Sequence, residues 1–364
     1  MGGSCTDRTL IFDLGRGTYT RLLELDAAFN TASIEAVFAS HSHQDHVLEM
    51  GHLAYFHWFD NGVAPGSVYT PLNYITPSNG TTFAFLESAM DNLQADMALR
   101  VNALAPASLN ITTFDTELGD DPQIIYNNGG VIVHSVSVPH FAYEAVSYHV
   151  SIEGTGTVVI SADINDEGGP YIQKFSSLNN GEVDVLVHGV VLHGYTIKPG
   201  KPSEGIGRSH TMPPRVVENA NALNAKALVL THLLPSPTRP DSMGPVPNAP
   251  YRTVDDFAFS MKYEGYNNEV IVADDLTAVY LGTGVDQRGY EVHLTNGSKR
   301  FDKPPPDDYV SFRELVGGES SGTENTGDTT PTSPVAEDTG KNSAFTKFSS
   351  GLFVLLIGTV VSMM

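Results

Sequence analysis

Residues 35–46 read EAVFASHSHQDH, an apolar run that leads directly into His41, His43, Asp45 and His46. The run EAVFAS favours a strand, and His41 and His43, two positions apart, would point to the same side of an extended chain. Imidazole and carboxylate groups are the usual ligands of Zn²⁺ and similar divalent ions. Buried together without an ion they would be costly. The stretch therefore predicts a metal site at the end of a strand.

The same arrangement recurs further along the chain. Other strand-like runs end at Asp13, His140, Asp163 and His232. Strand ends on one edge of a sheet converge in space, so these residues can meet at one site. Two metal ions could be held if one carboxylate is shared and water completes the shells. The metal ligands that we predict are His41, His43, Asp45, His46, His140, Asp163 and His232.

Apolar, β-rich runs alternate with helical patterns over the first 300 residues or so, which predicts an α/β layered domain. No GxGxxG or GxxxxGK[ST] motif follows any of the runs, so nothing indicates a nucleotide-binding sheet. The expected strands are 9–14, 35–40, 131–137, 157–163, 183–188, 227–232 and 269–274, and the expected helices are 18–26, 46–57, 82–104 and 213–225.

HSHQDH matches the HxHxDH signature of the metallo-β-lactamase fold superfamily, and the other landmarks follow the same order. They are FDLG with Asp13, VPH with His140, SAD with Asp163 and TH with His232. The resemblance covers roughly residues 8–282. Within the superfamily, residues 208–235 resemble the loop, helix, strand and metal histidine of the ribonuclease Z (tRNase Z)-like group.

This resemblance implies a four-layer αββα sandwich with a dinuclear zinc site, in which Mn²⁺ or Fe²⁺ could replace Zn²⁺. It assigns His41, His43 and His140 to the first ion, Asp45, His46 and His232 to the second, and Asp163 to both. Asp13 is expected to orient the HxHxDH loop. Asp45 would also position a metal-bridging hydroxide, and His210 would contact the scissile phosphate and help the leaving oxygen depart.

Two departures from the family pattern bear on the substrate. The chain has His188-Gly189 where the family often has a His-Glu pair, so His188 and His193 either line the pocket or are ordinary buried histidines. Between residues 61 and 110 the only basic residue is Arg100, although gripping tRNA needs several. We expect the aromatic and apolar residues there to form a helical cap; they are Tyr69, Tyr74, Phe83, Phe85 and Leu86.

The composition excludes some classes of function and of metal site. Lys and Arg number 20 against 42 Asp and Glu, a net charge of −22, which argues against a surface that coats nucleic acid. The one cysteine, Cys5, excludes an internal disulfide and a thiolate zinc site.

We therefore predict a dinuclear zinc-dependent hydrolase acting on a small phosphodiester or related ester. The alternatives are a tRNA 3′-end processing endoribonuclease, an arylsulfatase or lactonase-type hydrolase, and, in another class, a non-catalytic surface-displayed binding protein on this fold. A homodimer is a further expectation.

The composition divides the chain into three zones. Residues 1–300 form the catalytic domain, which begins almost at the Asp13 strand, so the opening hairpin of the family is missing and we expect a truncated start. Residues 301–343 are an acidic stalk rich in Pro, Ser and Thr, typical of disorder. Residues 344–364 end in LFVLLIGTVVSMM, which fits a GPI-attachment signal or a short anchor. These features predict a membrane-associated protein at the cell surface if a signal peptide precedes this start; the alternative is a cytoplasmic or organellar protein.

Overall fold

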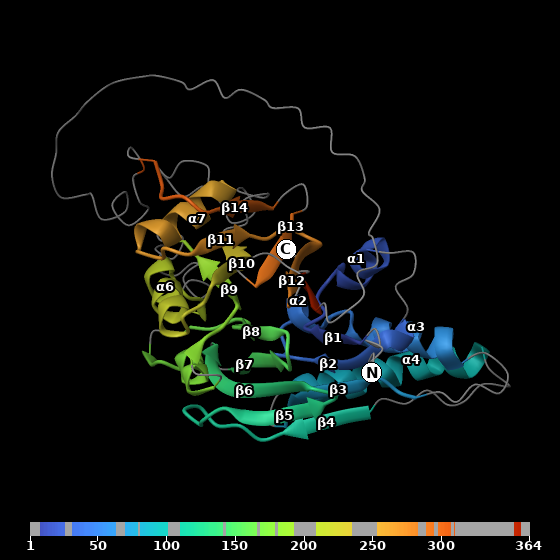
Figure 1. Ribbon diagram of the computed structural model, residues 1–364. Coiled ribbons are helices and arrows are strands. Elements are labelled where there is room, and N and C mark those ends of the chain that lie inside the picture. The colour runs from blue at the N-terminus through green and yellow to red at the C-terminus, as the bar shows by residue number, and fades with distance from the viewer. Residues whose placement is uncertain are drawn as a thin grey trace, which may run out of the picture.

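The computed structural model describes most of the predicted catalytic domain and one short piece of the tail (Figure 1). The described residues are 8–25, 31–62, 70–78, 81–100, 110–140, 143–165, 168–178, 181–192, 209–234, 253–282, 289–294, 298–306, 309 and 353–357. The predicted boundary at residue 300 falls within a described strand, Lys299–Phe301, whereas the boundary at 344 lies outside the described residues, so the three-zone division stays a prediction.

The first sheet has four parallel strands and one helical cover. Its order is β1 (Thr9–Phe12), β2 (Ile34–Phe38), β3 (Asn73–Pro77) and β4 (Asn110–Phe114). Trp58, Met50 and Leu86 are buried in the core between this sheet and its helices. The helical segments of this half are α1 (Thr18–Leu25), η1 (Thr31–Ser33), α2 (Gln44–Val47), α3 (Met50–Gly62) and α4 (Thr81–Arg100).

The second sheet has eight strands in the order β14-β11-β10-β9-β8-β7-β6-β5. Strands β8, β9, β10 and β11 run parallel to one another, and every residue of β9 is buried, as expected for a strand covered on both faces. The bounds are β5 (Gln123–Asn128), β6 (Val131–His140), β7 (Tyr143–Ile152), β8 (Gly156–Ile160), β9 (Val185–Val191), β10 (Ala227–Leu234), β11 (Glu269–Val272) and β14 (Lys299–Phe301).

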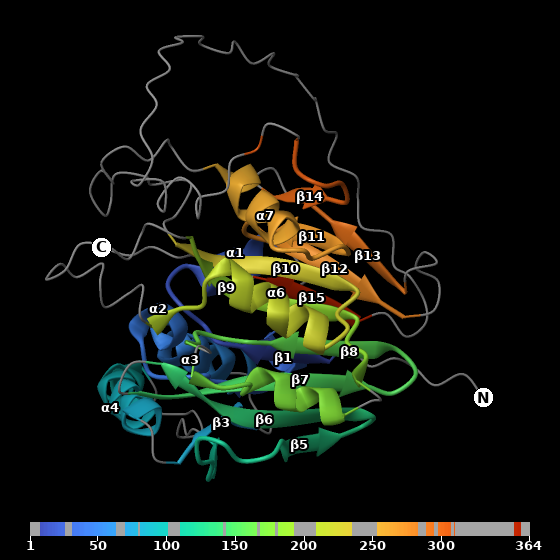
Figure 2. The same ribbon diagram turned by 90° about the vertical axis from the view of Figure 1, so that its left-hand side faces the viewer.

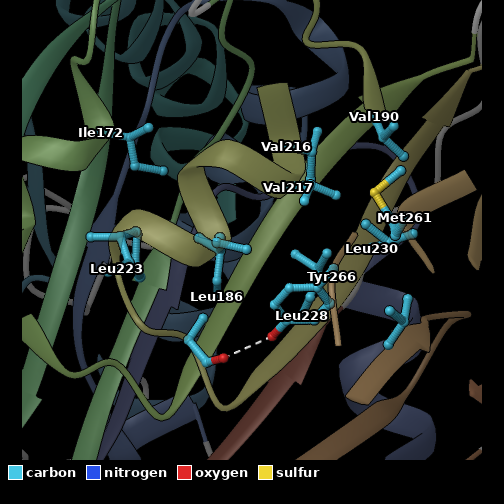
Figure 3. Packing of buried hydrophobic residues seen from close by; sticks show 14 of the residues in the cluster. Ile172, Leu186, Val190, Val216, Val217, Leu223, Leu228, Leu230, Met261 and Tyr266 are labelled. Carbon is cyan, nitrogen blue, oxygen red and sulfur yellow. Dashed lines mark hydrogen bonds between the residues drawn. The ribbon is translucent and has the colours of Figure 1, made fainter. Parts of the chain in front are cut away.

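Helices α6 (Pro213–Ala222) and α7 (Val254–Tyr263) and the 3₁₀ segment η3 (Ile172–Ser177) cover the outer face of this second sheet. Figure 3 shows side chains from α6, α7 and strands β9 and β10 meeting in this core. The hydroxyl of Tyr266 donates a hydrogen bond of 2.8 Å to the Ala225 carbonyl, which satisfies its one polar atom in an apolar setting.

A third, three-stranded sheet lies on the inner side of the eight-stranded one. It consists of β13 (Tyr290–His293), β12 (Thr277–Leu281) and β15 (Phe353–Ile357), all antiparallel. Phe38 of the first sheet, Val279 of the third and Tyr148 of the second belong to one buried core, so the first and third sheets together face the second. Figures 1 and 2 show helices on both outer sides of the strands. The predicted four-layer αββα sandwich is confirmed.

The structure corrects the predicted helical cap in part. Tyr74 lies in strand β3 and is 1% exposed, because the short run around it pairs with β2 on one side and β4 on the other. Phe83, Phe85 and Leu86 do lie on a helix, α4, and Leu86 is buried against the first sheet. Tyr69 is outside the described residues.

The C-terminal apolar segment enters the fold as a strand where it is described. Residues Phe353–Ile357 pair antiparallel with β12 along its whole length, from Thr277 opposite Ile357 to Leu281 opposite Phe353. Within the described residues no helix has the length and apolar character needed to cross a membrane. Membrane attachment, the surface location and the homodimer stay predictions.

Candidate metal centre

The predicted ligands come from both facing sheets and meet at one end of the sandwich. His41, His43, Asp45 and His46 follow β2, and α2 turns the chain so that Asp45 and His46 face back toward the sheets. The remaining donors belong to the eight-stranded sheet: His140 ends β6, Asp163 follows β8, and His232 lies on β10. They form two groups, His41, His43, His140 and Asp163, and Asp45, His46, Asp163 and His232, within each of which the donor atoms lie within 4.8 Å of one another.

The first group is dominated by three imidazoles. The Nδ1 atom of His43 lies 3.0 Å from Nε2 of His41 and 3.1 Å from Nε2 of His140. Nitrogens about 2.0–2.1 Å from a tetrahedral Zn²⁺ would be ~3.3 Å apart, so the spacing is close to that of a coordination triangle. The second carboxylate oxygen of Asp163, Oδ2, is 3.7 Å from Nε2 of His140.

The second group holds two carboxylates against two imidazoles. Nε2 of His46 is 3.4 Å from Oδ2 of Asp163 and 3.8 Å from Oδ2 of Asp45. Nε2 of His232 lies 3.3 Å and 3.4 Å from the same two oxygens. Asp163 therefore belongs to both groups, and it is 3% exposed.

Hydrogen bonds on the far side of three rings determine where the protons are. Nδ1 of His140 faces the carbonyl oxygen of Ser209 at 2.9 Å, and a carbonyl can only accept. Nδ1 of His46 donates to Oδ2 of Asp13 at 2.7 Å. Ser40 gives its hydroxyl proton to Asp13, so its Oγ must accept from Nδ1 of His41 at 3.0 Å.

These three rings therefore direct their Nε2 lone pairs inward when neutral. In the described structure Nε2 of His46 is buried and has no hydrogen-bond partner. Buried polar atoms normally have partners, and metal-bound imidazoles normally donate their other N–H to a fixed acceptor. The residues present thus fit one or two divalent metal ions, and the donor set of nitrogen and carboxylate oxygen suits zinc.

The surroundings keep both carboxylates of the predicted ligand set ionised. Burial opposes ionisation of Asp163, but His232, His46 and His210 outweigh it and hold the pKa of Asp163 well below its usual range. Burial likewise opposes ionisation of Asp45, yet the hydrogen bond from His232 and the nearby His46 lower its pKa to about 2.

All three histidines of the first group have a lowered pKa, with burial as the largest cause, and are shifted toward the neutral form that binds metals; the shifts of His41 and His140 are the larger ones. Burial lowers the pKa of His140 to about 4. Burial, reinforced by His46, brings the pKa of His41 well below its usual value. Both rings therefore remain unprotonated at neutral pH, with their lone pairs available to an ion.

Asp13 holds the HxHxDH loop in place. Its Oδ1 accepts from the Ser40 backbone N–H at 2.7 Å, and its Oδ2 accepts from the Ser40 hydroxyl and from His46. The backbone φ angles of Asp13 and His232 are +60° and +44°, a left-handed conformation that non-glycine residues rarely adopt. Such strain at a site is maintained only where the surroundings enforce it.

Gly15 allows the chain after Asp13 to pass against the loop. A Cβ atom at this position would lie 1.8 Å from the Asp45 carbonyl oxygen, so no other residue fits without displacing the loop. Glu49 then fixes the start of α1, because its carboxylate accepts from the backbone N–H groups of Gly17 and Tyr19 at 2.6 and 2.8 Å. Nothing in the sequence alone marks Gly15 or Glu49 as part of the site, although Gly15 is the last residue of FDLG.

His210 lies beside the second group, and its predicted contact with the scissile phosphate stays a prediction. Its Nε2 is 3.1 Å from Oδ2 of Asp163, its Nδ1 is 2.9 Å from the Ser209 hydroxyl, and its ring stacks on that of His232 at 5.1 Å.

His188 is placed differently from His210. It is fully buried, donates from Nδ1 to the Gly189 carbonyl at 2.6 Å and accepts from the Asn219 amide at 3.3 Å. Burial lowers its pKa to about 4. These contacts favour the buried alternative for His188, and His193 lies outside the described residues.

Comparisons with known proteins agree with this site. No family model matches the chain. A ribonuclease Z of Bacillus licheniformis is 28% identical over 225 residues, which cover 61% of this chain and 64% of that protein. A ribonuclease Z of Pyrobaculum neutrophilum is 25% identical over 241 residues, 61% of this chain and 75% of that protein.

Among solved structures, the short form of human tRNase Z aligns with a TM-score of 0.45 and 16% identity over 63% of this chain and 83% of its own. The chain spans somewhat less than two thirds of the length of the Bacillus ribonuclease Z that it matches. From the HxHxDH geometry, the αββα layers and the two sequence relatives, we conclude that this chain has the layered fold expected of a metallo-β-lactamase sandwich and is similar in sequence to ribonuclease Z.

Proposed function

We propose that this chain is a metal-dependent hydrolase that cleaves phosphodiester bonds and uses two Zn²⁺ ions. The observation that carries the proposal is the pair of buried donor groups that share Asp163. Three of their imidazoles have Nδ1 bonded to an acceptor outside the group, which leaves Nε2 for an ion. Mn²⁺ or Fe²⁺ would fit the same donors.

His41, His43 and His140 would hold one ion, Asp45, His46 and His232 the other, and Asp163 both. When bound, such ions lower the pKa of coordinated water and polarise a phosphoryl oxygen. Asp45, whose pKa is lowered to about 2, stays ionised and can orient the attacking water by accepting a hydrogen bond from it.

His210 is suited to the opposite side of the reaction. In the neutral ring its Nε2 carries the proton, because that atom faces the ionised Asp163 carboxylate at 3.1 Å. A substrate phosphate that enters between them would meet an N–H donor, which can stabilise the developing charge and protonate the leaving oxygen.

The net charge of −22 favours a small diester over a polyanion. Cleavage of tRNA at its 3′ end is the second candidate, because both sequence relatives are named ribonuclease Z. The fold also suits aryl sulfates and lactones, which belong in the same substrate panel.

The test uses the full chain loaded with Zn²⁺ and, separately, Mn²⁺. Metal content is measured by elemental analysis, and hydrolysis is followed with bis(p-nitrophenyl) phosphate, an aryl sulfate, a lactone and a 3′-extended precursor tRNA. We expect about two metal ions per chain and hydrolysis of the diester. Cleavage of the tRNA alone would favour the second candidate. Full metal loading with no turnover of any substrate would overturn the proposal and support a binding protein on this fold.

A further inference from the structure

Ser209 lies immediately before His210 and touches two histidines through two different atoms. Its carbonyl oxygen is 2.9 Å from Nδ1 of His140, and its hydroxyl oxygen is 2.9 Å from Nδ1 of His210. Ser209 is 1% exposed, and both ring contacts are buried. The backbone of Ser209 therefore contacts a predicted metal ligand, His140, while its side chain contacts the predicted proton donor, His210.

The carbonyl contact fixes His140. Because a carbonyl has no proton to give, Nδ1 of His140 must carry the hydrogen and Nε2 must carry the lone pair that faces the first donor group. This contact belongs to the backbone and would survive a change of side chain at position 209.

The hydroxyl contact fixes His210. Nε2 of His210 faces the Asp163 carboxylate at 3.1 Å, so in the neutral ring the hydrogen is on Nε2. Nδ1 then has only a lone pair, and the Ser209 hydroxyl is the donor that satisfies it. Without that donor, Nδ1 can carry the hydrogen instead, so the Nδ1–H tautomer competes with the Nε2–H form.

The segment that carries Ser209 is itself held firmly. The hydroxyl of Thr211 donates to the Ile164 carbonyl at 2.7 Å, next to Asp163, and the Val191 N–H donates to the Thr211 carbonyl at 2.9 Å. Residues 209–211 are all buried. The hydroxyl of Ser209 is therefore presented to His210 from a rigid support rather than from a loop free to adjust.

We propose that Ser209 is a positioning residue whose hydroxyl holds His210 in the Nε2–H tautomer, with the proton aimed at the metal centre, while its backbone carbonyl independently orients His140. The proposal deepens the function proposed above and rests on it only for its kinetic consequence.

The first readout needs no substrate. In the zinc-loaded full chain labelled with ¹⁵N-histidine, long-range ¹H–¹⁵N spectra report the tautomer of each ring, and His210→Gln assigns the signal. We expect the Nε2–H form of His210 in the parent protein and a mixed or inverted tautomer in Ser209→Ala, with the zinc content and the His140 signal unchanged. An unchanged His210 tautomer in Ser209→Ala would overturn the proposal, as would loss of zinc from that variant.

Kinetics provide the second readout. Ser209→Ala should lower kcat for the diester by about 3- to 10-fold, the effect of one hydrogen bond, with little change in KM, and Ser209→Thr should restore most of it. Ser147→Ala is the matched control, since this buried hydroxyl donates to the Ser161 carbonyl at 2.6 Å and, among the described residues, to no histidine. An equal kcat loss in Ser147→Ala, or no rescue by threonine, would contradict the proposal. If the tautomer shifts but no ester is hydrolysed by the parent, the proposed function fails and the positioning role stands.

Discussion

The metal centre and the His134–His149 pair are both clusters of imidazole rings, and both involve strand β6 of the same sheet. His134 of β6 pairs directly with His149 of β7, and their ring centroids are 5.8 Å apart. His149 is 1% exposed, neither of its ring nitrogens has a hydrogen-bond partner in the described structure, and its other ring neighbour is Phe175 at 5.6 Å.

The two clusters differ in what surrounds the rings. At the metal centre three Nδ1 atoms are bonded to acceptors and two carboxylates lie among the Nε2 atoms. Among the described residues, the His134–His149 pair joins no group of three or more donors. Buried histidines are therefore suited to bind a metal ion where an acceptor holds each Nδ1–H and carboxylates lie among the Nε2 atoms. Where both are missing, as around His149, the rings pack together and burial opposes their protonation.

The largest expected effect comes from removing the carboxylate that both groups share. Asp163→Ala should abolish loading of both ions and reduce ester hydrolysis to the level of the metal-free protein, because each group loses a ligand and the nearby rings lose their counter-charge. Elemental analysis of the purified variant measures this. Retention of two ions per chain would show that Asp163 is not a shared ligand.

The sequence predicts features that depend on residues close together in the chain better than contacts between residues far apart in it. The converging strand ends predict that the seven donors lie together, and the structure brings them together, because the periodicity of a strand and the edge of a sheet are local properties; that they bind an ion stays a prediction. Ser209 could not be found as the acceptor for His140, since 69 residues separate them.

Tertiary packing decided the other misses. The short apolar run around Tyr74 has no decisive period, so the sequence predicts a helical cap there, whereas pairing with β2 and β4 makes it a strand. The His134–His149 pair was not predicted either, because its two members have nothing in common in sequence except their residue type.

The next prediction separates metal binding from turnover within the centre. His210→Ala should keep both ions and lower kcat by about 10²-fold, the lower end of the range for loss of a general acid. His210 is absent from both donor groups, yet it contacts Asp163. Metal analysis and kcat on the same preparation measure the two effects. An unchanged kcat would make His210 a bystander, and loss of an ion would make it a ligand.

A smaller effect is expected from the support beneath the loop. Gly15→Ala should lower metal affinity by about 10- to 100-fold, as for other losses of support to ligands, because its new methyl group would meet the Asp45 carbonyl oxygen at 1.8 Å. Competition with a chromophoric chelator measures the affinity. Gly168→Ala is the control, since its Cβ would meet only the Tyr171 hydroxyl oxygen at 3.5 Å. Equal affinities in the two variants would show that the loop yields to the methyl group.

The smallest expected effect concerns the His134–His149 pair and the pH dependence of stability. Burial, reinforced by His134, lowers the pKa of His149 to about 4, whereas an unfolded histidine titrates near ~6.5. The unfolded chain therefore binds the proton first, so the free energy of unfolding is full above about pH 6.5 and falls as the pH drops toward 4, by on the order of 1–3 kcal/mol.

His149→Leu should remove this part of the acid sensitivity, because leucine fills the same apolar space beside Phe175 without a group to protonate. Denaturant unfolding of the parent and the variant between pH 7 and pH 4 measures the difference between the two slopes. His134→Leu should recover less, since burial rather than His134 is the main cause of the shift. Parallel slopes for the parent and His149→Leu would mean that His149 is hydrated or partnered in solution, and the contrast with the metal centre would then lie in the carboxylates alone.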